Sequence, residues 1–171
     1  LGKGSPTLVG MTLELPALTN LGPNMTASGD EPTGRALLTG IADKALALGR
    51  FDEAERVLGR TLRDLAERAK QGKNVPLHQV AEATAYALKL ADGTRKPFWL
   101  DWVFDIHAST GRLMTSDELE RVHDLVRRLR YGGAAQVRRY VEVVRQRAAD
   151  LALSERFILS RLESLGRMIS A

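Results

Sequence analysis

The sequence predicts an all-α fold built from helix hairpins. From residue 34 onward, apolar residues recur at the three- and four-residue spacing of amphipathic helices, with glycine-containing turns between them. Turns at Gly49, Gly93 and Gly132–Gly133 are spaced by roughly 40 residues, a period typical of helical repeat arrays. Aromatic residues make up 5% of the chain and hydrophobic residues 44%, so the interior must be mainly Leu, Ala and Val. We expect about seven helices, packed as antiparallel pairs.

Residues 1–33 have a different composition. They contain Pro6, Pro16, Pro23 and Pro32 and are rich in Gly, Thr and Asn, which predicts an extended arm or linker. The segment Val9–Leu15 alternates apolar and polar residues with the period of a strand. An isolated strand is not stable, so this arm either docks on the helical body or pairs with a second copy of the chain as a homodimer. Otherwise it is a disordered linker with chance alternation. The predicted domains are 1–33 and 34–171.

The first predicted hairpin joins a helix at about 34–48 to a helix at about 52–71 through Gly49. In both helices, apolar residues at helical spacing define the buried face. These residues are Leu38, Ile41, Ala42, Ala45 and Leu48 in the first helix and Ala54, Leu58, Leu62, Leu65 and Ala69 in the second.

The second predicted hairpin begins with an alanine-rich helix at 77–91, which Asp92 and Gly93 are expected to end. Pro97 suits the first turn of the following helix, which we expect to end at Gly111. This helix is apolar nearly all round, which predicts the most buried element of the fold. Its apolar residues are Phe98, Trp99, Leu100, Trp102, Val103, Phe104 and Ile106.

The last three predicted helices occupy about 116–130, 134–151 and 154 onward. Thr115 and Glu118 have the spacing of a capping box at the start of the first, and Ser154 is expected to cap the last. The last helix would cover the apolar end of the stack. The expected inward residues are Leu119, Val122, Val126 and Leu129, then Val137, Tyr140, Val141, Val144, Ala148 and Leu151, then Ile158, Leu162, Leu165 and Ile169.

The segment from residue 38 to residue 66 resembles a tetratricopeptide repeat. Ala42 and Ala54 occupy the small positions of its two helices, and Gly49 and Phe51 occupy the turn and its aromatic plug. Leu58 replaces the usual aromatic residue, and the later helix pairs depart further from the pattern. The resemblance implies a right-handed, tetratricopeptide-like solenoid that binds partners along an open face lined by the first helices of the hairpins.

Four short segments are similar to the helical C-terminal regions of bacterial forkhead-associated-domain proteins, notably from myxobacteria. These segments are Gly40–Arg50, Ala85–Ala91, Trp102–Asp105 and Ser154–Phe157. The resemblance implies a signalling protein with an N-terminal β-sandwich that binds phosphothreonine, although none of that domain's phosphate-binding residues is in this sequence. Because the chain begins with Leu1 and not with Met, we expect it to be part of a longer protein.

No recognisable catalytic, cofactor or metal-binding motif emerges from the sequence, so we expect no enzyme. Asp101 and Asp105 share a helix face, but His107 lies roughly 200° round the helix from Asp105, so the three cannot bind one metal ion. Cysteine is absent, which excludes disulfides and thiolate metal sites and favours the cytoplasm. No apolar run approaches the roughly 18 residues of a membrane span, so no membrane partner is expected.

Arginine residues gather on either side of the turn at Gly132–Gly133 and form the candidate partner-binding site. Bases exceed acids by a formal net charge of +4, which reflects either codon bias or an anionic partner. The site residues are Arg127, Arg128, Arg130, Arg138 and Arg139, which would cluster if the two helices form an antiparallel hairpin. The competing interpretation is a solvated surface, because acidic residues on the same helices can pair with them.

These patterns predict a non-enzymatic protein–protein interaction module, a scaffold within a larger bacterial signalling protein. Its partner would be a protein or a peptide. The alternative is binding of nucleic acid or another anionic surface through the arginine-rich hairpin. Nucleic acid is the less favoured partner, because the region has no recognisable motif and no stacking aromatic residues.

Overall fold

The computed structural model describes residues 32–171, and this part of the chain contains seven α-helices and no β-strand. The helices are α2 (Pro32–Ala47), α3 (Phe51–Lys70), α4 (Leu77–Thr94), α5 (Phe98–Thr110), α6 (Ser116–Arg128), α7 (Ala134–Arg145) and α8 (Leu153–Ser170). A short 3-10 helix, η1 (Ala148–Asp150), lies between α7 and α8. The all-α prediction is therefore confirmed for the described residues. The arm predicted at 1–33, with its Val9–Leu15 segment, lies outside them apart from its last two residues, which belong to α2.

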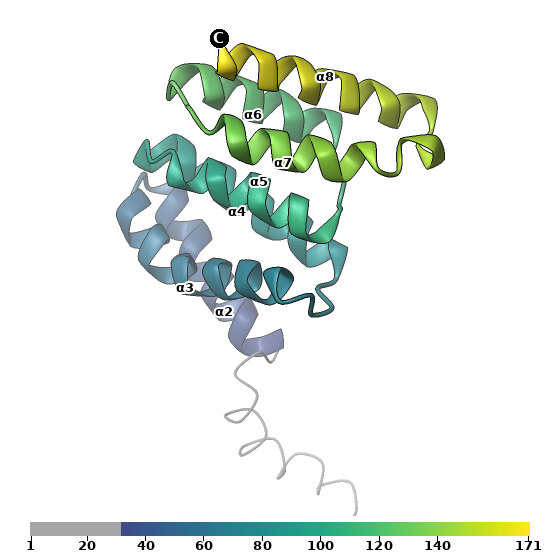
Figure 1. Cartoon of the computed structure of the whole chain (residues 1–171). Helices are drawn as coiled ribbons and strands as arrows, with labels where there is room; N and C mark the ends of the chain where they lie inside the picture. The colour runs from purple at the N-terminus through teal and green to yellow at the C-terminus, as the bar shows by residue number, and fades with distance from the viewer. Residues whose placement is uncertain (1–31) are drawn as a thin grey trace, which may run out of the picture. The chain divides into compact units, whose positions relative to one another are not determined.

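The chain divides into two compact units, Leu1–Ile41 and Ala42–Ala171, with the boundary inside α2. In the second unit, α3 to α8 follow a regular order of contact, which can be followed in Figure 1. Each helix from α5 onward packs against the helix two positions before it: α5 on α3, α6 on α4, α7 on α5 and α8 on α6. Consecutive helices also pack together at α3–α4, α4–α5 and α7–α8. The helices of this unit therefore form two layers, α3, α5 and α7 in one and α4, α6 and α8 in the other.

The core follows the predicted apolar faces closely in α3, α5 and α8. All five residues predicted for the buried face of α3 are buried. Helix α5 has eight buried residues among its thirteen and packs against α3, α4 and α7, as expected of a helix that is apolar nearly all round. Helix α8 buries Ile158, Leu162 and Leu165 and packs on both α6 and α7.

The apolar face predicted for the first helix is only partly correct. Ala42 and Ala45 are buried, whereas Leu38, Ile41 and Leu48 are exposed. The buried positions are thus the two smallest residues of the predicted face. Small side chains let helix backbones approach closely, whereas helical spacing alone does not distinguish a packed leucine from a solvated one.

The predicted end of the third helix at Gly93 is wrong, because α4 continues to Thr94 and ends at Arg95 in a left-handed conformation with φ of 62°. Pro97 explains this end, since a proline disfavours helical geometry at the residue before it, here Lys96. Gly93 instead provides space inside the helix. A Cβ atom at Gly93 would overlap the ring of Phe51, so this ring packs directly against the glycine backbone.

The predicted boundaries near the C-terminus also need correction. Helix α7 ends at Arg145 and not near residue 151, and the chain then enters η1. Ser154 does not cap α8, because the helix begins at Leu153 and Glu155 accepts a hydrogen bond from the backbone N–H of Ala152 at 2.9 Å. By contrast, the capping box of α6 and the glycine at the end of α5 are confirmed: Gly111 has φ of 73°.

Candidate functional site

Two of the five predicted site arginines are engaged in ion pairs with different helices. Arg128 on α6 bonds Asp92 of α4 and Asp124 of its own helix, each at 2.8 Å. These two carboxylates raise the pKa of Arg128 through hydrogen bonds and charge. Arg139 on α7 lies 3.5 Å from Asp105 of α5. Both arginines therefore link neighbouring helices across the surface.

The other three predicted site arginines are exposed, and none makes an ion pair with another described residue. Arg127 is in the last turn of α6, and Arg130 lies in the loop after it with φ of 53°. Arg138 lies on α7, where it lines a groove between α7 and α8.

Three of the five arginines contact or border different helices. Helices α6 and α7 are not among the extensively packed helix pairs, so the predicted arginine-rich hairpin is not a close-packed unit. Instead α6 packs on α4 and α8, and α7 packs on α5 and α8. Arg128 reaches α4, Arg139 reaches α5, and Arg138 lines the groove beside α8. Of the five, Arg138 is the one that lines this groove.

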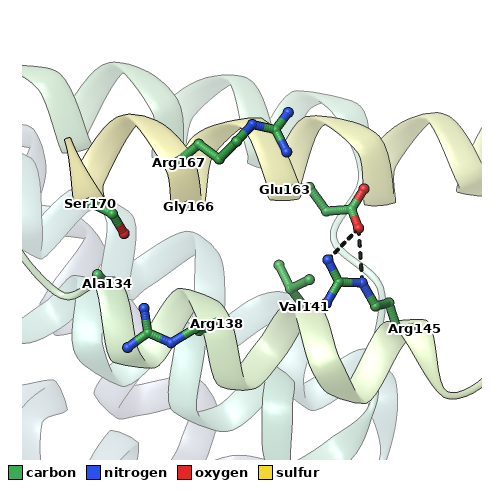
Figure 2. A pocket seen from close by; sticks show the side chains of 8 residues that line it. All are labelled: Ala134, Arg138, Val141, Arg145, Glu163, Gly166, Arg167 and Ser170. Atoms are coloured by element: carbon green, nitrogen blue, oxygen red, sulfur yellow. Dashed lines mark hydrogen bonds and ion pairs between the residues drawn. The ribbon is translucent and has the colours of Figure 1, made fainter.

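The groove between α7 and α8 is formed by one stripe of residues from each helix, as Figure 2 shows. Each stripe follows helical spacing, and the two helices run antiparallel, with residue 134 opposite residue 170 and residue 145 near residue 163. The groove has a volume of about 260 Å³. Its lining consists of Ala134, Arg138, Val141 and Arg145 from α7 and Glu163, Gly166, Arg167 and Ser170 from α8.

Small and apolar residues form much of the groove surface. Val141 is buried and Ala134 is half-buried. Gly166 presents only backbone, and a Cβ atom placed there would meet Val137 Cγ1 at 3.5 Å, an ordinary van der Waals contact. The glycine is therefore not required by the packing of α8 on α7.

The charges of the groove are unevenly paired along its length. At one end, Glu163 accepts hydrogen bonds from Arg145, with its carboxylate 2.8 Å from Nη2, and Glu142 lies 3.4 Å from the same guanidinium. Glu163 thereby raises the pKa of Arg145. Toward the other end, Arg167 donates to the hydroxyl of Ser164 at 3.0 Å, and neither Arg167 nor Arg138 pairs with a carboxylate of the described residues. The groove thus has two cations available to an anionic group.

His107 belongs to a buried polar network that the sequence pattern does not reveal. The network also contains Arg112, Glu118 and Tyr140. His107 Nδ1 lies 2.7 Å from the carbonyl of Val103, and Nε2 lies 2.9 Å from Arg112 Nη1. Burial lowers the pKa of His107 to about 4, so its ring is neutral, with Nδ1–H as the donor and Nε2 as the acceptor.

Arg112 extends this network to the start of α6 and to α7. Its guanidinium bonds both oxygens of Glu118, at 2.9 and 3.2 Å, and this pairing lowers the pKa of Glu118 despite its burial. The hydroxyl of Tyr140 donates to the carbonyl of Arg112 at 2.8 Å and accepts the N–H of Met114 at 2.9 Å. These side chains are partnered with one another and with nearby backbone, so the role of the network is to fix the α5–α6 loop.

Asp101 and Asp105, which share a face of α5, interact with different partners. Asp101 accepts a hydrogen bond from the hydroxyl of Tyr131 at 2.6 Å, whereas Asp105 faces Arg139. Burial raises the pKa of Asp105, and Arg139 opposes this shift. Residues 32–171 contain no group of His, Asp or Glu side chains arranged to hold a metal ion.

The sequence of the groove residues supports two different interpretations. Ala134, Val141 and Gly166 fit a helix contact, while Arg138 and Arg145 fit a solvated face. The pairing of these stripes depends on the contact between α7 and α8, which spacing within one helix cannot show.

Comparison of the chain with protein-family models, with curated proteins and with solved structures finds no match. Among the described residues, no helix combines the length and the apolar character that crossing a membrane requires.

Proposed function

We propose that the chain is a non-enzymatic protein-interaction module, a tetratricopeptide-like helical solenoid that binds an acidic segment of a partner protein in the α7–α8 groove. The resemblance to forkhead-associated-domain proteins extends this proposal to a scaffold in a larger bacterial signalling protein. The alternation of two helical layers in Ala42–Ala171 supports the proposal. In such a stack each helix contacts only its near neighbours, and α7 and α8 border a groove in the part of the chain that the structure describes.

The packing of the first hairpin also supports the solenoid. Ala42 and Ala54, the small positions of the tetratricopeptide pattern, are completely buried. Gly49 adopts φ of 74° in the turn between them. Phe51 packs its ring against Gly93 of α4, as an aromatic plug between successive helix pairs would. These features support the proposed tetratricopeptide-like packing of the first hairpin.

The observation that carries the choice of partner is the pair Arg138 and Arg167. Both guanidinium groups border a groove with an apolar and small-residue surface, and neither is neutralised by a carboxylate among the described residues. Guanidinium groups favour carboxylates because they can donate parallel hydrogen bonds to both oxygens. An acidic peptide segment with an apolar or small residue between its charges matches this combination.

A peptide-display selection tests the proposal. We expect the wild-type chain to enrich acidic sequences. The affinity of the enriched peptides should fall on the order of tenfold for the variant Arg138→Glu/Arg167→Glu, because exposed ion pairs contribute about 1 kcal/mol or less each. The matched control is Arg127→Glu, which reverses an exposed arginine on α6 that has no ion-pair partner among the described residues. Enrichment of no sequence, or equal loss in the control, would contradict the proposal.

Binding of nucleic acid or another anionic surface is the weaker proposal. Arg128, Arg139 and Arg145 are already paired with carboxylates, and these ion pairs lie on different helix contacts. A phosphate backbone would require several cations along one path and a steep fall in affinity with salt. In the same experiment, enrichment independent of peptide sequence and abolished by moderate salt would favour this alternative.

A further inference from the structure

The order of contacts in α3–α8 defines where an additional helix would lie. Every helix from α5 onward packs on the helix two positions before it, and α8 also packs on α7. A helix placed by the same rule after α8 would therefore contact α7 and α8. The surface at which it would do so is the α7–α8 groove.

The dimensions of the groove suit a helix. The α7 stripe runs from Ala134 to Arg145, which corresponds to about 16 Å at 1.5 Å per residue, or three helical turns. Helices pack at interaxial distances of about 8–10 Å, and the shorter distances require small side chains at the contact. Ala134, Gly166 and Ser170 are small residues of this kind in the lining of the groove.

The charges of the groove distinguish between possible helical occupants. The Arg145–Glu163 pair neutralises one end, whereas Arg138 and Arg167 leave two cations toward the other end. A second copy of this chain that paired its own groove here across a two-fold axis would bring the same two arginines together, which is unfavourable. The occupant that the charges favour is a segment of another protein with carboxylates at one end.

We propose that the α7–α8 groove binds an amphipathic α-helix of a partner protein, which lies against α7 and α8 as the next helix of the stack. Acidic residues on the two sides of its apolar stripe pair with Arg138 of α7 and Arg167 of α8, and the stripe of alanine or other small apolar residues packs on Gly166 and Val141. This inference rests on the proposed function and specifies the conformation of the bound segment.

Two synthetic peptides of identical composition test the conformation. Both carry an alanine-rich stripe, a glutamate on each side of this stripe and two prolines. In the first peptide the prolines occupy the N-terminal turn, where a helix tolerates them, and in the second they lie in the middle, where each costs about 3 kcal/mol of helix stability. Fluorescence anisotropy of the labelled peptides gives the affinity for the full chain. We expect the first peptide to bind at least tenfold more tightly.

Variants of the chain locate the binding. Arg138→Glu/Arg167→Glu and Gly166→Leu should each weaken the helical peptide by tenfold or more, while Arg127→Glu should leave its affinity unchanged. Thermal unfolding followed by circular dichroism confirms that each variant is folded. Because the sequence contains no cysteine, a single introduced cysteine can be tested for a disulfide with a cysteine on the peptide. Ala134→Cys, in the groove lining, should form this disulfide. Ala135→Cys, at the next position, which is exposed, is the control and should not form it.

The outcomes separate this inference from the proposed function. If the two peptides bind with equal affinity and both lose it in Arg138→Glu/Arg167→Glu, the helical conformation is overturned. The proposal that the groove binds an acidic segment would then still hold. If Gly166→Leu leaves the affinity for the helical peptide unchanged, the inference is overturned, because the helix must then bind elsewhere. If neither peptide binds, the inference is overturned as well, while the display selection decides the proposed function independently.

Discussion

Gly93 shows how a single residue can be correctly noticed and wrongly interpreted in a sequence. A glycine beside an aspartate is typical of a turn, and helix propensity alone predicts that α4 ends there. In the structure the same glycine lies within α4, and the ring of Phe51 occupies the space where a side chain would be. The contact joins residues distant in sequence, so local patterns could not predict it.

Replacing Gly93 with alanine therefore should destabilise the protein. In an open helix position the change would be favourable by about 1 kcal/mol, but here the new Cβ would overlap the Phe51 ring, and overpacking costs about 1–3 kcal/mol. Chemical denaturation of Gly93→Ala and of Gly40→Ala measures the two effects. A Cβ atom at Gly40 would have no neighbour within 4 Å, so substitution there should stabilise the helix. A gain in stability for Gly93→Ala would contradict the assigned contact.

His107 makes a second prediction at the scale of one residue. Its pKa falls from the ordinary 6.5 to about 4 because the ring is buried, so the unfolded chain binds a proton that the folded chain does not. The contribution of His107 to the free energy of unfolding is fully present above pH 6.5 and is lost as the pH falls toward 4. The loss amounts to roughly 3 kcal/mol, at about 1.4 kcal/mol per pKa unit. Glu118, whose pKa is lowered, adds a loss in the same direction below its ordinary value of 4.5.

The measurement is the free energy of unfolding between pH 7 and pH 5, a range in which His107 titrates in the unfolded state. The wild-type chain should lose stability over this range, and His107→Gln should show a shallower slope whatever its absolute stability. An unchanged slope would mean that the ring of His107 is accessible to protons in the folded state.

Individual helices were more predictable than their ends. The capping box at Thr115 and Glu118, the glycine at the end of α5 and the buried faces of α3 and α8 follow from side chains close together in sequence. The early end of α7 does not, because the residues after Arg145 have no helix-breaking signal. In the structure the side chain of Arg147 donates to the carbonyl of Gly111, 36 positions away. This contact ties the segment after α7 to the end of α5.

The capping box gives a prediction at the scale of an element. The hydroxyl of Thr115 accepts the backbone N–H of Glu118 at 3.1 Å, and the carboxylate of Glu118 accepts the N–H of Thr115 at 2.9 Å. Thr115→Ala removes the first of these bonds and should cost about 1 kcal/mol, the usual effect of losing an N-cap side chain. Ser116→Ala, at the next exposed position, should change thermal stability little. Equal effects of the two substitutions would show that the cap is not formed.

At the scale of the whole molecule, the sequence predicts paired helices but not which pairs pack together. The expected third hairpin, α6 with α7, is replaced by contacts of both helices with α8. In this arrangement Arg128 and Arg139 pair with carboxylates of α4 and α5, and Arg138 lines the groove between α7 and α8. The relevant information is distributed over three helices, and apolar periodicity describes each helix separately.

The two-layer stack predicts an order of local stability. Helix α5 is packed on α3, α4 and α7, whereas α8 has a solvated outer face that exposes Leu153 and Phe157. Backbone amides in α5 should therefore exchange with deuterium most slowly among the described helices, and those of α8 more quickly. Hydrogen-exchange mass spectrometry measures this directly. Slower exchange in α8 than in α5 would indicate that the outer face of α8 is covered in solution.

The central claim is that the last pair of helices forms the docking surface for an acidic partner segment. Chemical-shift mapping by NMR, with a peptide from the display selection added to the labelled chain, tests it most directly. We predict that the perturbed amides follow the two stripes of the groove, around Arg138 on α7 and from Gly166 to Ser170 on α8. Perturbations confined to the surface formed by α3 and α5, or spread over all exposed arginines alike, would contradict it.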